Sequence, residues 1–205
     1  MIPCILVHSP YDSATIFASD CASEISALLR SRSLQLIELF GADANKKKLQ
    51  EYLQSNLSQV HCFLDYGHGN ETALFGHNDE VLVEMRSAVL LRKKICCVFA
   101  CSAARQLGKE IIRKGGISFL GFDGDFMFFP PHKEIFKKCI NSSVKAMVID
   151  KKPIGMAFEY MKKTFNEMID YLTSIIGTSN WVAIVCLRID RDRLELVGDR
   201  LASLW

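Results

Sequence analysis

The chain has 205 residues, of which 49% are hydrophobic and 23% are charged, and its formal net charge is +2. This length suits one globular domain with an ample core, so we expect a single domain over residues 1–205. The composition excludes a disordered chain and argues against a membrane protein. The largest basic cluster, Lys46 to Lys48, has no aromatic platform beside it, which is typical of a solvated helix face and does not indicate a nucleic-acid partner.

Short β-rich runs alternate with segments of helical period in the first half of the chain. This alternation is typical of an α/β domain around a mainly parallel sheet. The expected strands cover residues 2–7, 34–40, 60–66, 94–100 and 117–121. Two apolar runs around a polar turn predict a hairpin over residues 72–83, and a short helix is expected over residues 85–91.

Capping residues mark the expected helices of this half. Asp12 and Ser13 offer N-cap oxygens to the first helix, and the second is expected to start after Asp43. A third helix is predicted from Ala103 to the Gly115-Gly116 pair, because glycine accepts the positive φ that ends a helix.

The second half predicts two helices and a closing hairpin. Residues 133–149 and 154–176 have helical period, whereas Trp181 to Ile189 and Arg193 to Val197 are β-rich runs. Turn residues from Gly177 to Asn180 interrupt the uncharged stretch there, so no membrane span is expected. The predicted architecture has three layers, a mostly parallel central sheet flanked by helices, with a C-terminal β-hairpin.

The eight cysteines are expected to be reduced thiols. They include no Cys-x-x-Cys pair, so a structural zinc site is not indicated. The chain opens with an apolar run instead of the basic region and cleavage site of a secretory signal. We therefore expect a cytoplasmic protein.

Two residues stand just past the carboxyl ends of expected strands, where the ligand crevice of an open α/β sheet lies. His68 follows the third strand between Gly67 and Gly69, and glycine lets a backbone turn sharply near a ligand. Cys101 follows the fourth strand and has small neighbours. If the two strands are parallel neighbours, the imidazole and the thiol emerge side by side on one rim.

Such a pair is typical of nucleophilic catalysis. His68 can take the thiol proton of Cys101 and produce a thiolate that attacks a carbonyl carbon, with further stabilisation from the dipole of the helix expected after it. The backbone N–H groups of Gly69 and Cys101 are the predicted oxyanion hole. His77 is an alternative base, although its neighbours are typical of a hairpin turn. Taken alone, Cys101 also fits a core thiol and His68 a loop histidine.

The segments around this pair carry a resemblance to a known family. One apolar run, Cys62 to His68-Gly69, ends in His-Gly, and a later one, Ile95 to Ala100-Cys101, ends in Ala-Cys. Together they resemble the double signature of the caspase-like cysteine peptidases, the clan of caspases, legumains, gingipains, separases and CHAT domains. The continuation through Gly121 and the closing Val197-Gly198-Asp199 resemble the gingipain-like and CHAT-like branches.

The resemblance implies a cysteine endopeptidase that hydrolyses a protein substrate without a metal or organic cofactor. Residues 99–103 depart from the Gln-Ala-Cys-x-Gly of animal caspases, so cleavage after Asp is not implied. An acid in the S1 pocket would favour cleavage after Arg or Lys, and the candidates are Asp65, Asp123 and Asp125. No third catalytic group is required, because a backbone carbonyl often orients the imidazole in this clan.

The same resemblance implies a small microbial protease in a stress, cell-death or antiviral defence pathway, controlled by a regulatory partner, an operon-encoded substrate, processing or oligomerisation. Two other functions stay open. One is a catalytically silent caspase-like module that binds a partner through the same crevice. The other is a flavodoxin-like nucleotide or signalling domain, although the turn from His8 to Asp12 lacks the glycines and cations that hold phosphate.

Overall fold

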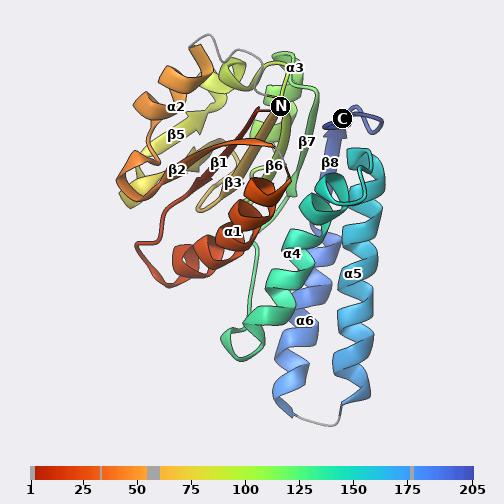
Figure 1. Ribbon diagram of the computed structural model, residues 1–205. Coiled ribbons are helices and arrows are strands. Elements are labelled where there is room, and N and C mark those ends of the chain that lie inside the picture. Colours follow the sequence, from red (N-terminus) through yellow and green to blue (C-terminus); the bar gives the residue numbers. More distant parts are fainter. Residues whose placement is uncertain (1–2, 33, 55–60, 176–177) are drawn as a thin grey trace.

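The computed structural model describes residues 3–32, 34–54, 61–175 and 178–205. A six-stranded sheet lies at its centre (Figure 1), and its five parallel strands and one antiparallel edge strand confirm the mostly parallel sheet that the sequence predicts. In spatial order the strands are β2 (Gln35–Phe40), β1 (Pro3–His8), β3 (Cys62–Tyr66), β6 (Ile95–Phe99), β7 (Ser118–Phe122) and β8 (Leu194–Gly198). Four residues assigned to elements or turns from the sequence, Ile2, Val60, Ile176 and Gly177, lie outside the described residues.

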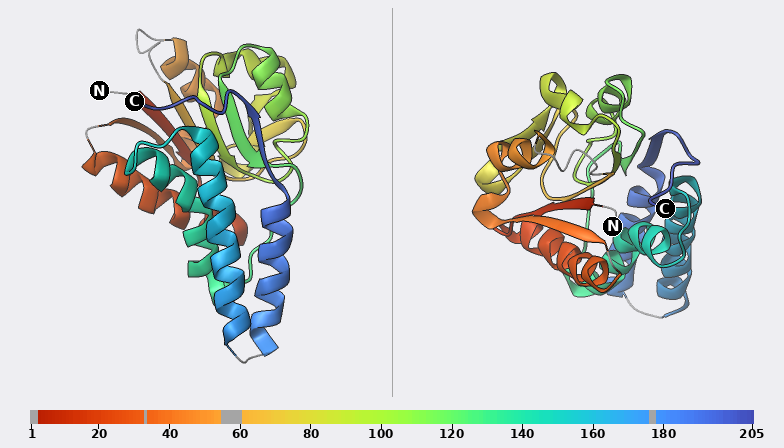
Figure 2. Two further views of the ribbon diagram at one scale, coloured as in Figure 1. Left: turned by 90° about the vertical axis from the view of Figure 1, so that its right-hand side faces the viewer. Right: turned by 45° about the horizontal axis from the view of Figure 1, so that its top comes forward.

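Helices cover both faces of the sheet, so the three-layer arrangement is confirmed (Figures 1 and 2). The first face packs against α1 (Ser13–Ser31), α4 (Lys133–Val148) and α5 (Ile154–Ser174), and α6 (Thr178–Asp192) packs against α5. The second face packs against α2 (Lys46–Gln54), η3 (Met85–Leu91), α3 (Leu107–Arg113) and a hairpin of β4 (Ala73–Phe75) and β5 (Val81–Glu84). Short 3-10 turns occur at η1 (Gly41–Asp43), η2 (His77–Asp79) and η4 (Pro130–His132).

Strand burial explains why the central strands were easy to find in the sequence. Every residue of β1, β3, β6 and β7 is buried, because both faces of these parallel strands are covered. Such strands are continuous apolar runs, and alternate side chains enter the two cores. Leu64 packs toward α1 and its neighbour Phe63 toward the hairpin side.

The predicted C-terminal β-hairpin is wrong. Residues 181–189 belong to helix α6, and only β8 joins the sheet, antiparallel to β7. The β-branched run suggested a strand, but Ala183, Ile184 and Leu187 are its buried apolar residues, a helical spacing that fits packing against α5. Tertiary contact here overrides local β propensity. Figure 2 shows α5 and α6 running antiparallel beyond the sheet.

The predicted start of the third helix is also wrong. α3 begins at Leu107, and residues 101–106 form consecutive turns. Ser102 has a φ of +56°, a left-handed conformation that interrupts a right-handed helix. Cys101 therefore does not lie at a helix N-terminus, and the expected dipole contribution to its chemistry is absent from the described structure. Gly115, with a φ of +95°, does end α3 as predicted.

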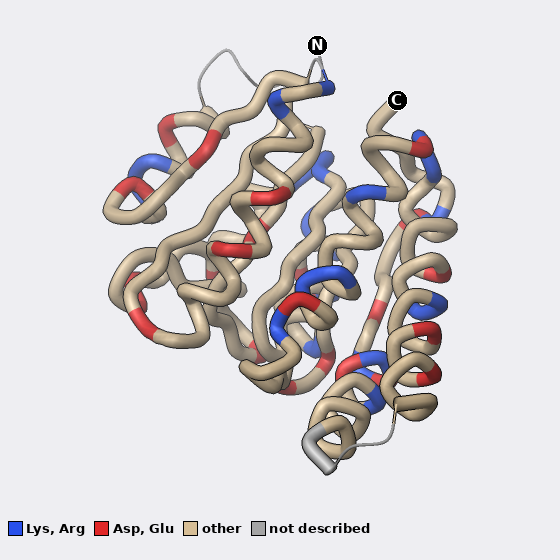
Figure 3. The backbone as a smooth tube through the Cα atoms, turned by 60° about the horizontal axis from the view of Figure 1, so that its bottom comes forward, with Lys and Arg blue, Asp and Glu red and all other residues tan. Residues whose placement is uncertain are grey.

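The surface carries charges of both signs. Figure 3 shows Lys and Arg interspersed with Asp and Glu along the described backbone. Among the described residues, no helix combines the length and apolar character required to cross a membrane.

Candidate active site

The sheet topology creates a crevice beside β1 and β3. These strands are neighbours, but the chain leaves β1 for α1 on one face and leaves β3 for the β4–β5 hairpin on the other. In open α/β sheets such a switch point opens a ligand crevice at the carboxyl ends of the strands. Asp12 follows β1 and His68 follows β3, so both side chains stand at this point. The order β2-β1-β3-β6-β7 is also that of flavodoxin-like sheets, so strand order alone does not separate the predicted functions.

Asp12 and His68 form a hydrogen-bonded pair across the switch point. Nε2 of His68 lies 2.7 Å from Oδ2 of Asp12, while Oδ1 of Asp12 accepts the backbone N–H of Thr15 at 2.8 Å and caps α1 as predicted. The carboxylate is fixed by the helix and in turn fixes the imidazole. Since Nε2–H donates to Asp12, the neutral ring has an acceptor at Nδ1, which bonds to no other described residue.

The ionisation of Asp12 reflects this double role. Partial burial acts to raise the pKa of its carboxyl, but hydrogen bonds from His68 and Thr15 outweigh burial and lower the pKa to about 2. The carboxylate is therefore charged at neutral pH and can stabilise a protonated imidazole. The rings of Tyr11 and His68 also make an edge-to-face contact, with 5.9 Å between their centroids.

Cys101 follows β6, and β6 pairs in parallel with β3, with Tyr66 opposite Phe99. The prediction that these two strands are parallel neighbours is confirmed. Cys101 is half-buried and, like the seven other cysteines, a free thiol. Burial raises the pKa of the Cys101 thiol above its ordinary value, the backbone N–H of Phe126 partly opposes this shift, and Asp125 adds to it. At rest the group is a thiol.

The backbone is strained at Ser102, directly after Cys101. Ser102 holds its positive φ through two contacts: its N–H donates to the carbonyl of Gly124 at 2.9 Å, and its hydroxyl donates to Asp125 Oδ1 at 3.1 Å. A left-handed non-glycine residue costs about 1 kcal/mol or more and persists only where its surroundings fix it, which is common at functional sites. These contacts tie Cys101 to the loop that follows β7.

Two backbone N–H groups at the site have no acceptor among the described residues. Gly69 faces Leu74 in an isolated antiparallel bridge whose hydrogen bonds are made by the flanking residues, so its own N–H points away from β4. Within the described part of the chain, neither Gly69 nor Cys101 donates its N–H to another residue. The two residues are close, since a Cβ placed on Gly69 would lie 3.2 Å from the carbonyl oxygen of Cys101.

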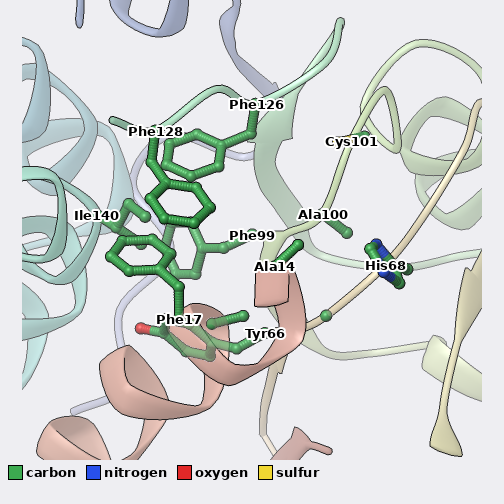
Figure 4. A pocket seen from close by; sticks show the side chains of 12 residues that line it. Ala14, Phe17, Tyr66, His68, Phe99, Ala100, Cys101, Phe126, Phe128 and Ile140 are labelled. Atoms are coloured by element: carbon green, nitrogen blue, oxygen red, sulfur yellow. The ribbon is translucent and has the colours of Figure 1, made fainter. Parts of the chain in front are cut away.

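A pocket of about 90 Å³ joins His68 and Cys101 (Figure 4). Its wall is mostly apolar, and no residue that lines it is a Lys, Arg, Asp or Glu. Figure 4 shows the phenylalanine rings gathered on one side and His68 on the other. The lining residues are Ala14, Phe17, Ala18, Tyr66, Gly67, His68, Phe99, Ala100, Cys101, Phe126, Phe128 and Ile140.

None of the three predicted S1 acids lines this pocket. Asp65 is buried within β3 on the face toward the hairpin, and burial raises its pKa well above the ordinary value. Asp123 and Asp125 are exposed on the loop after β7. Strand alternation explains the first case, because Tyr66 enters the pocket and its neighbour Asp65 points to the opposite face. His77, the alternative base, hydrogen bonds Ser9 Oγ at 2.8 Å and does not line the pocket.

Three site features were missed from the sequence. Asp12 was recognised as a helix cap, but its second oxygen pairs with His68. Ser102 gave no signal of its left-handed backbone. Asp190 is completely buried and accepts the Met127 N–H at 2.9 Å, so it holds the loop that carries the pocket phenylalanines. Asp190 stands in the charged segment from Arg188 to Arg193, where nothing in the sequence distinguishes it as a buried side chain.

Within residues 3–32, 34–54, 61–175 and 178–205, no group of three or more His, Cys, Asp or Glu side chains could hold a metal ion. A scan against models of known protein families finds no family that matches the chain, and a search of curated proteins finds no match.

Proposed function

We propose that the chain is a cysteine endopeptidase of the caspase-like kind, with Cys101 as nucleophile and His68 as general base. One observation carries the proposal: parallel strands β3 and β6 end side by side and present an imidazole and a thiol to one pocket at the switch point of the sheet. The unpaired N–H groups of Gly69 and Cys101 support it, because an oxyanion hole needs donors that are free at rest.

The proposed reaction runs through a thioester. Nδ1 of His68 takes the proton of Cys101 Sγ as the sulfur bonds to the carbonyl carbon, and the oxyanion is held by the two N–H groups. The C–N bond then breaks, and the imidazolium gives its proton to the departing amine. Water, deprotonated by His68, attacks the thioester, and the sulfur leaves as a thiol after taking back the proton. No metal or organic cofactor takes part.

Asp12 is assigned as the positioning residue for His68. Its carboxylate fixes the tautomer that leaves Nδ1 free to accept a proton, and its negative charge favours the imidazolium formed during the reaction. This assignment replaces the backbone carbonyl that the family resemblance implies. The thiol is protonated at rest, so the proposed mechanism transfers the proton when substrate is bound.

The resting geometry also favours one alternative, a catalytically silent module that binds a partner. Nε2 of His68 is bonded to Asp12, and among the described residues no hydrogen bond joins His68 to Cys101. Burial and the nearby Asp125 keep Cys101 neutral. Such a module would bind a peptide in the same pocket without cleaving it.

The substrate proposed is a protein, and the compartment proposed is the cytoplasm. Eight free cysteines, six of them buried, support a reducing environment. The role in microbial stress, cell death or antiviral defence follows from the family resemblance alone and belongs to the same proposal.

Cleavage of a peptide library by purified protein tests the proposal. The native chain should cleave, and Cys101→Ala should lose all detectable cleavage while folding normally. Cys186→Ala is the matched control, because Cys186 is also half-buried but lies on α6 and does not line the pocket. Equal cleavage by native and Cys101→Ala protein would contradict the proposal. A folded native chain that binds peptides and cleaves none would support the silent module.

A further inference from the structure

The pocket beside Cys101 is built from aromatic rings whose arrangement defines its chemistry. Phe17 and Phe128 stack with their centroids 4.2 Å apart and their planes 10° apart, and Phe126 lies parallel to Phe17 at 6.2 Å. The rings of Tyr66 and Phe99, from the two central strands β3 and β6, lie with their centroids 4.7 Å apart. The rings come from α1, the sheet and the loop after β7, so three separate parts of the chain form one apolar wall (Figure 4).

Of the polar side chains near the phenylalanine rings, Tyr66 is hydrogen bonded, whereas Asp190, which does not line the pocket, has one oxygen bonded and no partner for Oδ2 among the described residues. The hydroxyl of Tyr66 donates to Asn141 Oδ1 at 3.0 Å, and Asp190 uses one oxygen to hold the loop at Met127. A Lys or Arg side chain in the pocket would find no carboxylate among the lining residues, and an Asp or Glu would find no Lys or Arg. Burial of an unpaired charge is strongly unfavourable, so the pocket selects an uncharged apolar group.

The volume sets the size of that group. A cavity of about 150 Å³ holds a benzene molecule, and this pocket encloses about 90 Å³. An aliphatic side chain of four carbons fits this space, whereas the indole of tryptophan does not. Burial of such a side chain in place of a methyl group is worth a factor of roughly 10 to 100 in kcat/KM.

We propose that this pocket is the specificity subsite of the enzyme and that it binds an apolar side chain of leucine size immediately before the scissile bond. The inference rests on the proposed function, since it places the carbonyl of that residue against Cys101 and Gly69. It replaces the expected preference for Arg or Lys, because the three acids assigned to that preference lie elsewhere.

Matched fluorogenic tetrapeptide amides, acetyl-Ala-Ala-Ala-X with X as Leu, Ala, Arg, Asp or Trp, test the subsite. The Leu peptide should have the highest kcat/KM, about 10 to 100 times that of Ala, and Arg and Asp should fall below Ala. A higher kcat/KM for Arg or Asp than for Leu would overturn the proposal. Phe128→Ala should enlarge the pocket and raise the kcat/KM ratio of Trp to Leu at least tenfold.

A filling variant and a binding arm complete the test. Ala18→Leu should lower kcat/KM for Leu about tenfold or more and leave Ala little changed, whereas Ala27→Leu, exposed on the same helix, should change neither. NMR titration measures the binding of the same sequences, as plain carboxamides, to Cys101→Ala protein and does not depend on catalysis. If the Leu peptide binds most tightly but the native protein cleaves none of the peptides, the peptidase is overturned and the subsite is upheld. Equal binding of all peptides would overturn the subsite.

Discussion

Replacement of Asp12 by Asn separates the two roles that the structure gives to one side chain. Asn is as good an N-cap as Asp, so the hydrogen bond to Thr15 and the start of α1 should be retained. The charge beside His68 is lost, and the amide can present its N–H side to Nε2, which favours the other tautomer. The variant therefore perturbs the base and spares the helix.

The expected loss of stability in Asp12→Asn follows from the ionisation of Asp12. Burial acts to raise its pKa, but hydrogen bonds from His68 and Thr15 lower it to about 2, and a difference of about two pH units corresponds to roughly 2–3 kcal/mol for an enclosed group. The side chain is 44% exposed, so screening by water reduces the contribution to about 1 kcal/mol or less. The folded pKa lies below the unfolded one, so this stabilisation is present above about pH 4 and is lost as the pH falls toward 2.

The effect on catalysis should exceed the effect on stability. Loss of the carboxylate that orients a catalytic imidazole costs up to about 10⁴ in kcat, and at this partly exposed pair we expect a loss of about 10 to 100. KM should change little, because Asp12 does not line the pocket. Steady-state kinetics of the best peptide measures both constants, and thermal unfolding measures stability.

Two comparisons make the result decisive. Asp12→Ala should lose the same catalytic activity and a further stability of about 1 kcal/mol, since it also removes the cap. Asp20→Asn, an exposed acid on the same helix, should be unchanged in kcat. If Asp12→Asn keeps kcat within twofold of the native value, the carboxylate does not assist His68 and the positioning role is refuted.

Gly69→Ala places a methyl 2.8 Å from Cβ of Ala100 and should lower kcat/KM at least tenfold and the free energy of unfolding by about 1–3 kcal/mol; native values of both would contradict this close approach. Burial raises the pKa of Asp190 to about 8, above its unfolded value, so the free energy of unfolding should fall from pH 4 to pH 8. Asp190→Asn should flatten this pH dependence in thermal unfolding, and an unchanged slope would contradict the role of Asp190. Burial also raises the pKa of the Cys101 thiol, so the rate of its alkylation by iodoacetamide should still increase above pH 9, where the rate for denatured protein levels off. A rate for the native protein that becomes constant below pH 8 would contradict the raised pKa.

The central sheet could be predicted because parallel strands covered on both faces are continuous apolar runs. The same property placed His68 and Cys101, since each follows such a run directly. The cap at Asp12 was recognisable for a local reason, because its partner Thr15 lies three residues away. These features depend on short stretches of sequence.

The predictions that failed concern features that depend on contacts between distant segments. The run from Trp181 is helical because its buried residues face α5, which local β propensity does not reveal. Asp65 was assigned to the substrate pocket because it stands near a strand end, but alternation along β3 turns it to the opposite face. The pocket phenylalanines on the loop after β7 have no period that would identify a wall.

The measurement that tests the central claim most directly is the location of a peptide electrophile on the protein. Native protein treated with a leucine-containing peptidyl chloromethyl ketone, then digested and analysed by mass spectrometry, should carry one adduct, on Cys101, and His68→Ala should slow its formation at least tenfold. Adducts spread over the other cysteines, or an adduct on Cys101 whose rate is unaffected by the loss of His68, would contradict a catalytic pair at the ends of β3 and β6.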